Sequence, residues 1–170
     1  NARSQEGWVM EYRVLGPLEV REGDRPLPLG GAKQRALLAL LILNANRVVT
    51  RQRLIDELWG DEPPETAVGG VQVYVSRLRK LLPPETLVTR PPGYSLLVDE
   101  DEVDAHRFER LLAAGKDALA AAQPAAAAET LRTALALWRG PALADLVAEP
   151  FAQTEAARLE ELQVTALEAR

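Results

Sequence analysis

The stretch between residues 67 and 82 carries the side chains with the most distinctive chemistry in this chain. It holds three positive charges and no negative one. Its residues that could contact a partner are Gln72, Val73, Ser76, Arg77, Arg79 and Lys80. Arginine can donate two hydrogen bonds to guanine, glutamine can pair with adenine, and valine can touch a thymine methyl group. A serine hydroxyl or a lysine can hold a phosphate. We therefore interpret this stretch as a candidate recognition element for the major groove of DNA.

The spacing of apolar residues predicts that residues 67–82 form a helix. One stripe at the helical period is expected to pack on a core, namely Val71, Val75, Leu78 and Leu82. The opposite face presents Gly69, Val73, Ser76, Arg77 and Lys80, with Gln72 and Arg79 on its flank. Glycine costs about 1 kcal/mol relative to alanine inside a helix. The Gly69–Gly70 pair therefore means either that the helix begins at Val71 or that the backbone approaches DNA closely there. An ordinary surface helix is the alternative interpretation of the whole stretch.

The elements around this helix predict an α+β winged helix-turn-helix. Strands are expected at residues 12–15, 18–20 and 26–29, and helices at 33–44 and, after the N-cap Thr50, up to residue 59. Two further strands, at residues 87–89 and 94–97, flank a hairpin turn that carries Arg90. An arginine at the tip of such a wing fits a narrow minor groove or an adjacent phosphate. Its presence favours DNA binding over an ordinary surface helix.

Residues 104–170 predict an all-α domain. We expect Asp104 to cap a helix over residues 105–121, Pro124 to open a second helix that ends at Gly140, and Pro150 to begin a third. The first two would form one tetratricopeptide-like hairpin. The residues expected to be buried are Phe108, Leu111, Leu112 and Leu119 in the first helix, Ala127, Leu131, Ala134, Leu135 and Trp138 in the second, and Phe151, Leu159, Leu162, Ala166 and Leu167 in the third.

The net charge of −5 over 170 residues averages two unlike regions. Taken alone, a negative net charge argues against binding to nucleic acid. Residues 1–98, however, contain 13 lysines and arginines against 11 acids, whereas residues 99–170 contain 7 against 14. We expect a winged-helix domain over residues 10–98, a solvated acidic linker over 99–103 and a helical domain over 104–170. Residues 1–9 are set aside as a processed leader or a cloning remnant.

The composition excludes several kinds of active site. The absence of cysteine rules out disulfides, thiolate metal sites and cysteine nucleophiles. His106 is the single histidine, which rules out a multi-histidine metal site, and no catalytic pattern of serine or a second histidine accompanies it. We therefore expect neither an enzyme nor a metal or cofactor site. Because no run of about 20 apolar residues exists, we expect no transmembrane helix. The lack of cysteine and of a visible secretory signal fits a cytoplasmic location.

Six motifs follow one another along the chain in a specific order. They read KQRALLA (33–39), LIDELWG (54–60), VQVYVSRLR (71–79), TRPPGY (89–94), DAHRF (104–108) and LWRGPAL (137–143). Together they resemble the SARP family, the Streptomyces antibiotic regulatory proteins, over nearly everything from Met10 onward. The resemblance implies an OmpR-type winged helix followed by a bacterial transcriptional activation domain of tetratricopeptide-like helices.

The resemblance also implies partners and site residues. It implies double-stranded DNA with direct repeats in promoters, bound head to tail by two subunits, with the helix in the major groove and the wing in the minor groove. It implies contact with RNA polymerase, especially its sigma factor, and control of secondary-metabolite (antibiotic) biosynthesis genes. By position, Gln72, Val73, Ser76, Arg77 and Arg79 lie on the family's recognition helix, and Arg90 and Tyr94 on its wing. Trp59 matches a position whose indole N–H bonds a phosphate in related domains, and Lys33 and Arg35 are candidate phosphate contacts.

Alternative interpretations remain open at this level. A scaffold that binds proteins through the winged helix and the helical repeats is the second class, although it has no need for both Arg77 and Arg90. Trp59 and Tyr94 can also be packing residues, and Arg79 can pair with an acid within the domain. The last predicted helix runs to the final residue without a stop signal. We therefore expect either a chain cut from a longer activation domain or first helices that pack back on the winged helix.

Overall fold

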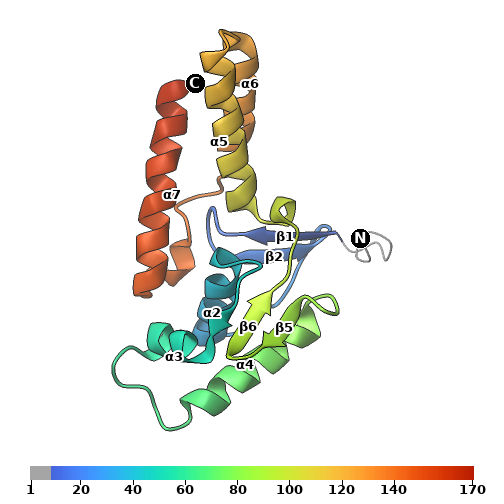
Figure 1. Ribbon diagram of the computed structural model, residues 1–170, viewed down its shortest axis with the longest axis vertical. Helices are drawn as coiled ribbons and strands as arrows, with labels where there is room; N and C mark the ends of the chain where they lie inside the picture. The colour runs from blue at the N-terminus through green and yellow to red at the C-terminus, as the bar shows by residue number, and fades with distance from the viewer. Residues whose placement is uncertain (1–8) are drawn as a thin grey trace.

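The structure is a computed structural model that describes residues 9–170, so nearly all of the segment set aside as a leader lies outside it. One end of the molecule contains two small sheets and three helices, and long helices rise together from the other end (Figure 1). Both ends contribute to one continuous apolar core. Within the described residues, no helix is long and apolar enough to cross a membrane.

The first sheet is antiparallel and differs from the predicted strands. It consists of β1 (Met10–Arg13), β2 (Glu19–Glu22) and β3 (Arg25–Pro26), in that order. The strands expected over residues 12–15 and 26–29 were therefore placed too late in the chain. Residues 14 and 15 leave the sheet because the N–H groups of Val14 and Leu15 donate to the Asp104 carboxylate, at 2.8 and 3.1 Å.

Three helices pack against the sheets, and their bounds confirm the predicted ones to within one residue. They are α2 (Ala32–Leu43), α3 (Arg51–Trp59) and α4 (Ala67–Leu81). Thr50 caps α3 as predicted, since its hydroxyl accepts a hydrogen bond from the Arg53 N–H at 3.0 Å. The predicted apolar stripe of α4 is buried. Because α4 includes Gly69 and Gly70, the alternative that the helix begins at Val71 is wrong.

The predicted hairpin forms the wing, and a strand that the sequence did not predict joins it. The second sheet contains β4 (Val49–Thr50), β5 (Leu87–Arg90) and β6 (Gly93–Leu96), in the order β4-β6-β5. A Cβ atom on Gly93 would lie 1.9 Å from the Val49 carbonyl oxygen. The approach of β6 to β4 therefore requires glycine at this position, and it anchors the wing to the start of α3.

The helical part contains three long helices and two short 3-10 turns. These are η1 (Glu100–Glu102), α5 (Asp104–Ala120), α6 (Pro124–Leu135), η2 (Ala144–Leu146) and α7 (Pro150–Ala169). Pro124 and Pro150 open their helices as predicted. The helix α5 pairs with α6, and α7 runs beside them (Figure 1).

Three details of the helical prediction were wrong. The helix α6 ends at Leu135, so Trp138 lies beyond it, where its ring meets Phe108 edge-on with 5.4 Å between ring centres. Leu119 and Leu167 are 42% and 44% exposed rather than buried. Both lie on helix surfaces that remain open to solvent.

Asp104 connects the two parts instead of capping α5. It is the first residue of the helix and is buried, with its carboxylate turned to the backbone N–H groups of Val14 and Leu15. Burial raises the pKa of this carboxyl, and the two N–H donors and the nearby Arg139 oppose that shift. The acidic run before it is exposed, yet it forms η1, and the Val103 that follows is buried. The segment predicted to be a solvated linker thus contains a 3-10 turn, and its first three residues are exposed.

Candidate nucleic-acid interface

The outer face of α4 leaves its polar and charged side chains open to solvent. The exposed residues are Gln72, Val73, Ser76, Arg77, Arg79 and Lys80. This face lies at the end of the molecule away from α6 (Figure 1). Within residues 9–170, neither Arg77 nor Lys80 forms an ion pair with an acidic side chain. Their charges are therefore available to an anionic partner.

Arg79 holds the wing against α4 through contacts with β5 and β6. Its Nε donates to the Leu87 carbonyl oxygen at 2.9 Å, and its Nη2 donates to the Thr89 hydroxyl at 2.6 Å. The guanidinium also lies 5.8 Å from the centre of the Tyr94 ring. Tyr94 is buried beneath it, with 9% of its surface exposed. The structure thus gives Arg79 neutral wing partners in place of an acid, and it makes Tyr94 a packing residue.

The region of the wing tip contains the expected cation Arg90 and a second cation, Arg51, that was not predicted from the sequence. Arg90 is exposed and ends β5 opposite Gly93. Arg51 lies next to the wing, since its N–H donates to the Pro92 carbonyl oxygen at 3.1 Å. Arg51, Thr89 and residues 91–94 line a hollow of about 220 Å³. A cation in the first turn of a helix is unfavourable because it opposes the helix dipole. The position of Arg51 directly after the N-cap Thr50 could therefore have marked it as a candidate contact in the sequence.

Lys33 and Trp59 lie together at the end of α3. The Lys33 ammonium donates to the Leu58 carbonyl oxygen and lies 5.8 Å from the centre of the Trp59 ring. Trp59 is half-buried, and a Cβ atom on Gly70 would lie 3.4 Å from its ring edge. The ring therefore packs against the first turns of α4. No residue in the described part of the chain accepts a hydrogen bond from the Trp59 indole N–H.

Arg35 is not brought to the α4 face. Its guanidinium pairs with Asp145, within η2, and donates to the Leu18 carbonyl oxygen at 2.8 Å. Arg139 crosses the same junction from the helical part, reaching the Pro17 carbonyl oxygen at 2.6 Å and Glu19 at 3.2 Å. Both arginines tie the first sheet and α2 to the helical part. We therefore remove Arg35 from the candidate phosphate contacts.

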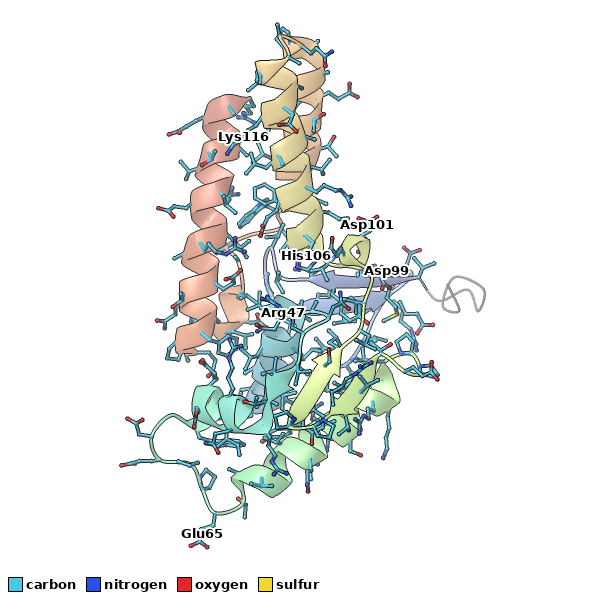
Figure 2. The ribbon with its side chains drawn as sticks, in the orientation of Figure 1. Arg47, Glu65, Asp99, Asp101, His106 and Lys116 are labelled. Carbon is cyan, nitrogen blue, oxygen red and sulfur yellow. The ribbon has the colours of Figure 1, made fainter. Side chains whose placement is uncertain are left out.

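In residues 9–170 there is no group of three or more histidine, cysteine, aspartate or glutamate side chains that could hold a metal ion. His106 lies on α5, between the two parts of the molecule (Figure 2). The chemistry of the exposed α4 face is hydrogen bonding and positive charge.

Two family models match the chain, one for each part. Residues 25–96 match "Transcriptional regulatory protein, C terminal", and residues 103–170 match "Bacterial transcriptional activator domain". Both models fall on folded units described above, with η1 between them.

Curated relatives are regulators from actinobacteria. Regulatory protein AfsR of Streptomyces coelicolor is 41% identical over 170 residues, which cover 99% of this chain and 17% of AfsR. Transcriptional regulatory protein EmbR of Mycobacterium tuberculosis is 41% identical over 84% of this chain and 39% of its own length. Transcriptional regulator RedD of Streptomyces coelicolor is 37% identical over 95% of this chain and 48% of its own length.

A solved structure of Mycobacterium tuberculosis EmbR, in complex with a low-affinity phosphopeptide, has the same fold. It superposes with a TM-score of 0.89 at 39% sequence identity, covering 92% of this chain and 43% of the EmbR chain. This chain thus spans less than half the length of each of these relatives. The two matched domains in this order, together with these relatives, place the chain in the SARP family of transcriptional regulators.

Proposed function

We propose that this chain is a sequence-specific DNA-binding transcriptional activator that reads its site with the exposed face of α4. The observation that carries the proposal is the unpaired positive charge of Arg77 and Lys80 on a chain whose net charge is −5. Fifteen residues of helix are about 22 Å long. A helix of this size fits along the major groove, which is about 12 Å wide.

Each exposed side chain of this face has a role in the proposed complex. Arg77 donates to a guanine, Gln72 pairs with an adenine, and Val73 contacts a thymine methyl group. Ser76 and Lys80 hold phosphates.

The wing supports this contact from the side. Arg90 enters the minor groove or contacts an adjacent phosphate. Arg51 and the Trp59 indole N–H bind phosphates of the DNA backbone. Arg79 and Tyr94 act indirectly, because they fix the wing relative to α4. Lys33 supports Trp59, since its ammonium stacks over the indole ring.

We further propose that two copies bind direct repeats head to tail. Repeats about 10–11 base pairs apart place both copies on the same face of the duplex. The SARP resemblance supports this arrangement. Because α4 and the wing lie at one end of the molecule (Figure 1), each copy can contact the DNA with both.

The helical part is proposed to recruit RNA polymerase, especially through its sigma factor. Residues 99–170 carry 14 acids against 7 lysines and arginines, which disfavours contact with DNA. Asp104, Arg139 and Arg35 join this part to the first sheet and α2. A partner docked on α5–α7 would therefore be held at a defined angle to the DNA. The genes controlled would be those of secondary-metabolite, including antibiotic, biosynthesis.

Selection of bound sites from random DNA, followed by footprinting, tests DNA binding, repeat orientation and spacing together. We expect an enriched pair of directly repeated sites about one helical turn apart. Enrichment of inverted repeats would contradict the head-to-tail arrangement. Failure to enrich any sequence would contradict DNA reading and favour the protein-interaction scaffold.

A further inference from the structure

A cleft of about 660 Å³ separates α2 and α3 from α5 and α7. Small-molecule sites commonly have volumes of about 300–1,000 Å³ and lie between domains. Arg47, from the turn before β4, and His106, from α5, both line this cleft and are labelled in Figure 2. Leu43 and Phe151 add apolar surface from opposite sides. The cleft is at a distance from α4 and plays no part in the proposed DNA contact.

The charged groups of the cleft fall into a set paired with one another and an open set. On the helical side, Arg158 donates to Glu109 at 2.7 Å and to Glu155 at 2.6 Å. These hydrogen bonds raise the pKa of the Arg158 guanidinium, which therefore stays charged and keeps both carboxylates occupied.

The open set lies on the winged-helix side and is positive. Arg47 is exposed and Arg53 reaches only the neutral Asn44 side-chain oxygen, at 3.2 Å. In the described part of the chain, neither arginine forms an ion pair. Glu57 is the one acid on this side of the cleft. On this side two guanidinium groups face one carboxylate, whereas on the helical side Arg158 faces two, so the positive charge offered to a ligand is local to the winged-helix side.

His106 contributes an unsatisfied polar atom from the opposite side. Its Nδ1 is buried and has no hydrogen-bond partner among the described residues. Buried polar atoms in native proteins nearly always have such a partner, whether protein, water or ligand. Because this atom has almost no exposed surface, a ligand would pair with it by turning the imidazole toward the cleft, and one that also contacts Arg47 would span the two parts of the molecule.

We propose that this cleft binds a small amphipathic organic anion. Its carboxylate or phosphate group would lie on Arg47 and Arg53, where guanidinium groups match such oxygens geometrically. Its apolar body would lie against Leu43 and Phe151, and the His106 imidazole would complete the polar end. Because the ligand touches both parts, it would also hold α5–α7 at a fixed angle to the winged helix. The site goes beyond the proposed function and does not depend on it.

The single histidine of the chain makes the test direct, because its imidazole proton signals in an NMR spectrum of the untagged protein belong to His106 alone. Phenyl phosphate and benzoate are titrated at constant pH, up to about 10 mM so that millimolar affinity is detected. We expect a saturable shift of the His106 signals with at least one of these probes. The neutral analogue benzyl alcohol, which lacks the anionic group, should cause none.

Variants locate the anionic group. Arg47→Gln and Arg53→Gln should each weaken binding of the probe at least tenfold. Arg132→Gln removes an exposed arginine on α6 that does not line the cleft, so it should leave the affinity unchanged. Signal dispersion in the same spectra verifies that each variant is folded. Absence of a saturable shift with both anions, or equal affinity in the wild type and both cleft variants, would overturn the proposal.

Discussion

Asp104→Ala is expected to destabilise the whole chain, although residue 104 lies outside both sheets. The carboxylate is the acceptor for two backbone N–H groups, those of Val14 and Leu15, and all three residues are buried. Alanine leaves both N–H groups without an acceptor. A buried donor that loses its partner costs about 1–3 kcal/mol. The two together give about 2–6 kcal/mol, reduced because the buried charge also disappears.

We therefore expect a loss of about 3 kcal/mol in the free energy of unfolding for Asp104→Ala. For a chain of this size, each kcal/mol lowers the thermal midpoint by about 2–4 °C, so the expected fall is about 6–12 °C. Circular dichroism at 222 nm measures the midpoint, and urea titration gives the free energy independently.

Asp101→Ala is the matched control, three residues away in the acidic run that precedes Asp104. Asp101 is exposed and pairs with the exposed Arg110, and surface pairs of this kind contribute about 0–1 kcal/mol. Its midpoint should stay close to that of the wild type. Equal midpoints for Asp104→Ala and Asp101→Ala would refute the reasoning, because Val14 and Leu15 would then have found other acceptors at no cost.

Four further predictions concern pH, the wing and the DNA contact. Because burial raises the pKa of Asp104, the folded state binds the Asp104 proton at higher pH than the unfolded state does. The wild type should therefore gain stability relative to Asp104→Asn as pH falls through that raised pKa. Urea titrations at several pH values measure the two stabilities, and parallel curves would argue against this. Gly93→Ala should lower the free energy of unfolding by about 2–4 kcal/mol because its Cβ would clash with β4. Gly69→Ala, where a Cβ meets nothing, should raise it by about 0.5–1 kcal/mol. Urea titration measures both changes, and changes of the same sign would be inconsistent with the geometry. Arg77→Ala should lose about 1–3 kcal/mol of affinity for the selected site and little for random DNA, and fluorescence anisotropy showing equal losses would leave only a phosphate contact. Arg90→Ala should reduce the slope of log K against log salt by about 1, and an unchanged slope would remove Arg90 from the interface.

The elements that the sequence predicted well are those with local signals. The α4 stripe has a helical period over four positions, Thr50 caps α3 through a residue three positions away, and Pro124 and Pro150 open helices at their first turns. Each of these signals is read from fewer than a dozen neighbouring residues. The exposed face of α4 follows from the same periodicity, since residues opposite a buried stripe must face outward.

The features that the sequence did not predict depend on contacts between distant segments. A strand of two residues such as β4 has no period to detect, and it forms because Gly93 allows a close approach 44 positions later. Asp104 looks like an N-cap locally, but its acceptor oxygens are taken by residues 90 and 89 positions away. Arg35 and Arg79 are of a residue type that commonly contacts DNA, yet Arg35 is held by Asp145 and Arg79 by the wing. Local sequence does not distinguish a structural arginine from an available one.

Sorting the arginines in this way leaves few cations for DNA. On the α4 and wing surface the exposed cations whose side chains form neither an ion pair nor a hydrogen bond, within residues 9–170, are Arg51, Arg77, Lys80 and Arg90; Arg79 is excluded because β5 holds its guanidinium. If each neutralises one phosphate, the slope of log K against log salt is about −3.6, and affinity falls only about a hundredfold between 50 and 200 mM salt. So small an electrostatic contribution gives one copy weak binding at physiological salt. Two copies on adjacent repeats double the contribution, which is a physical reason for paired sites in the proposed function. A single repeat that binds as tightly as two would remove that reason.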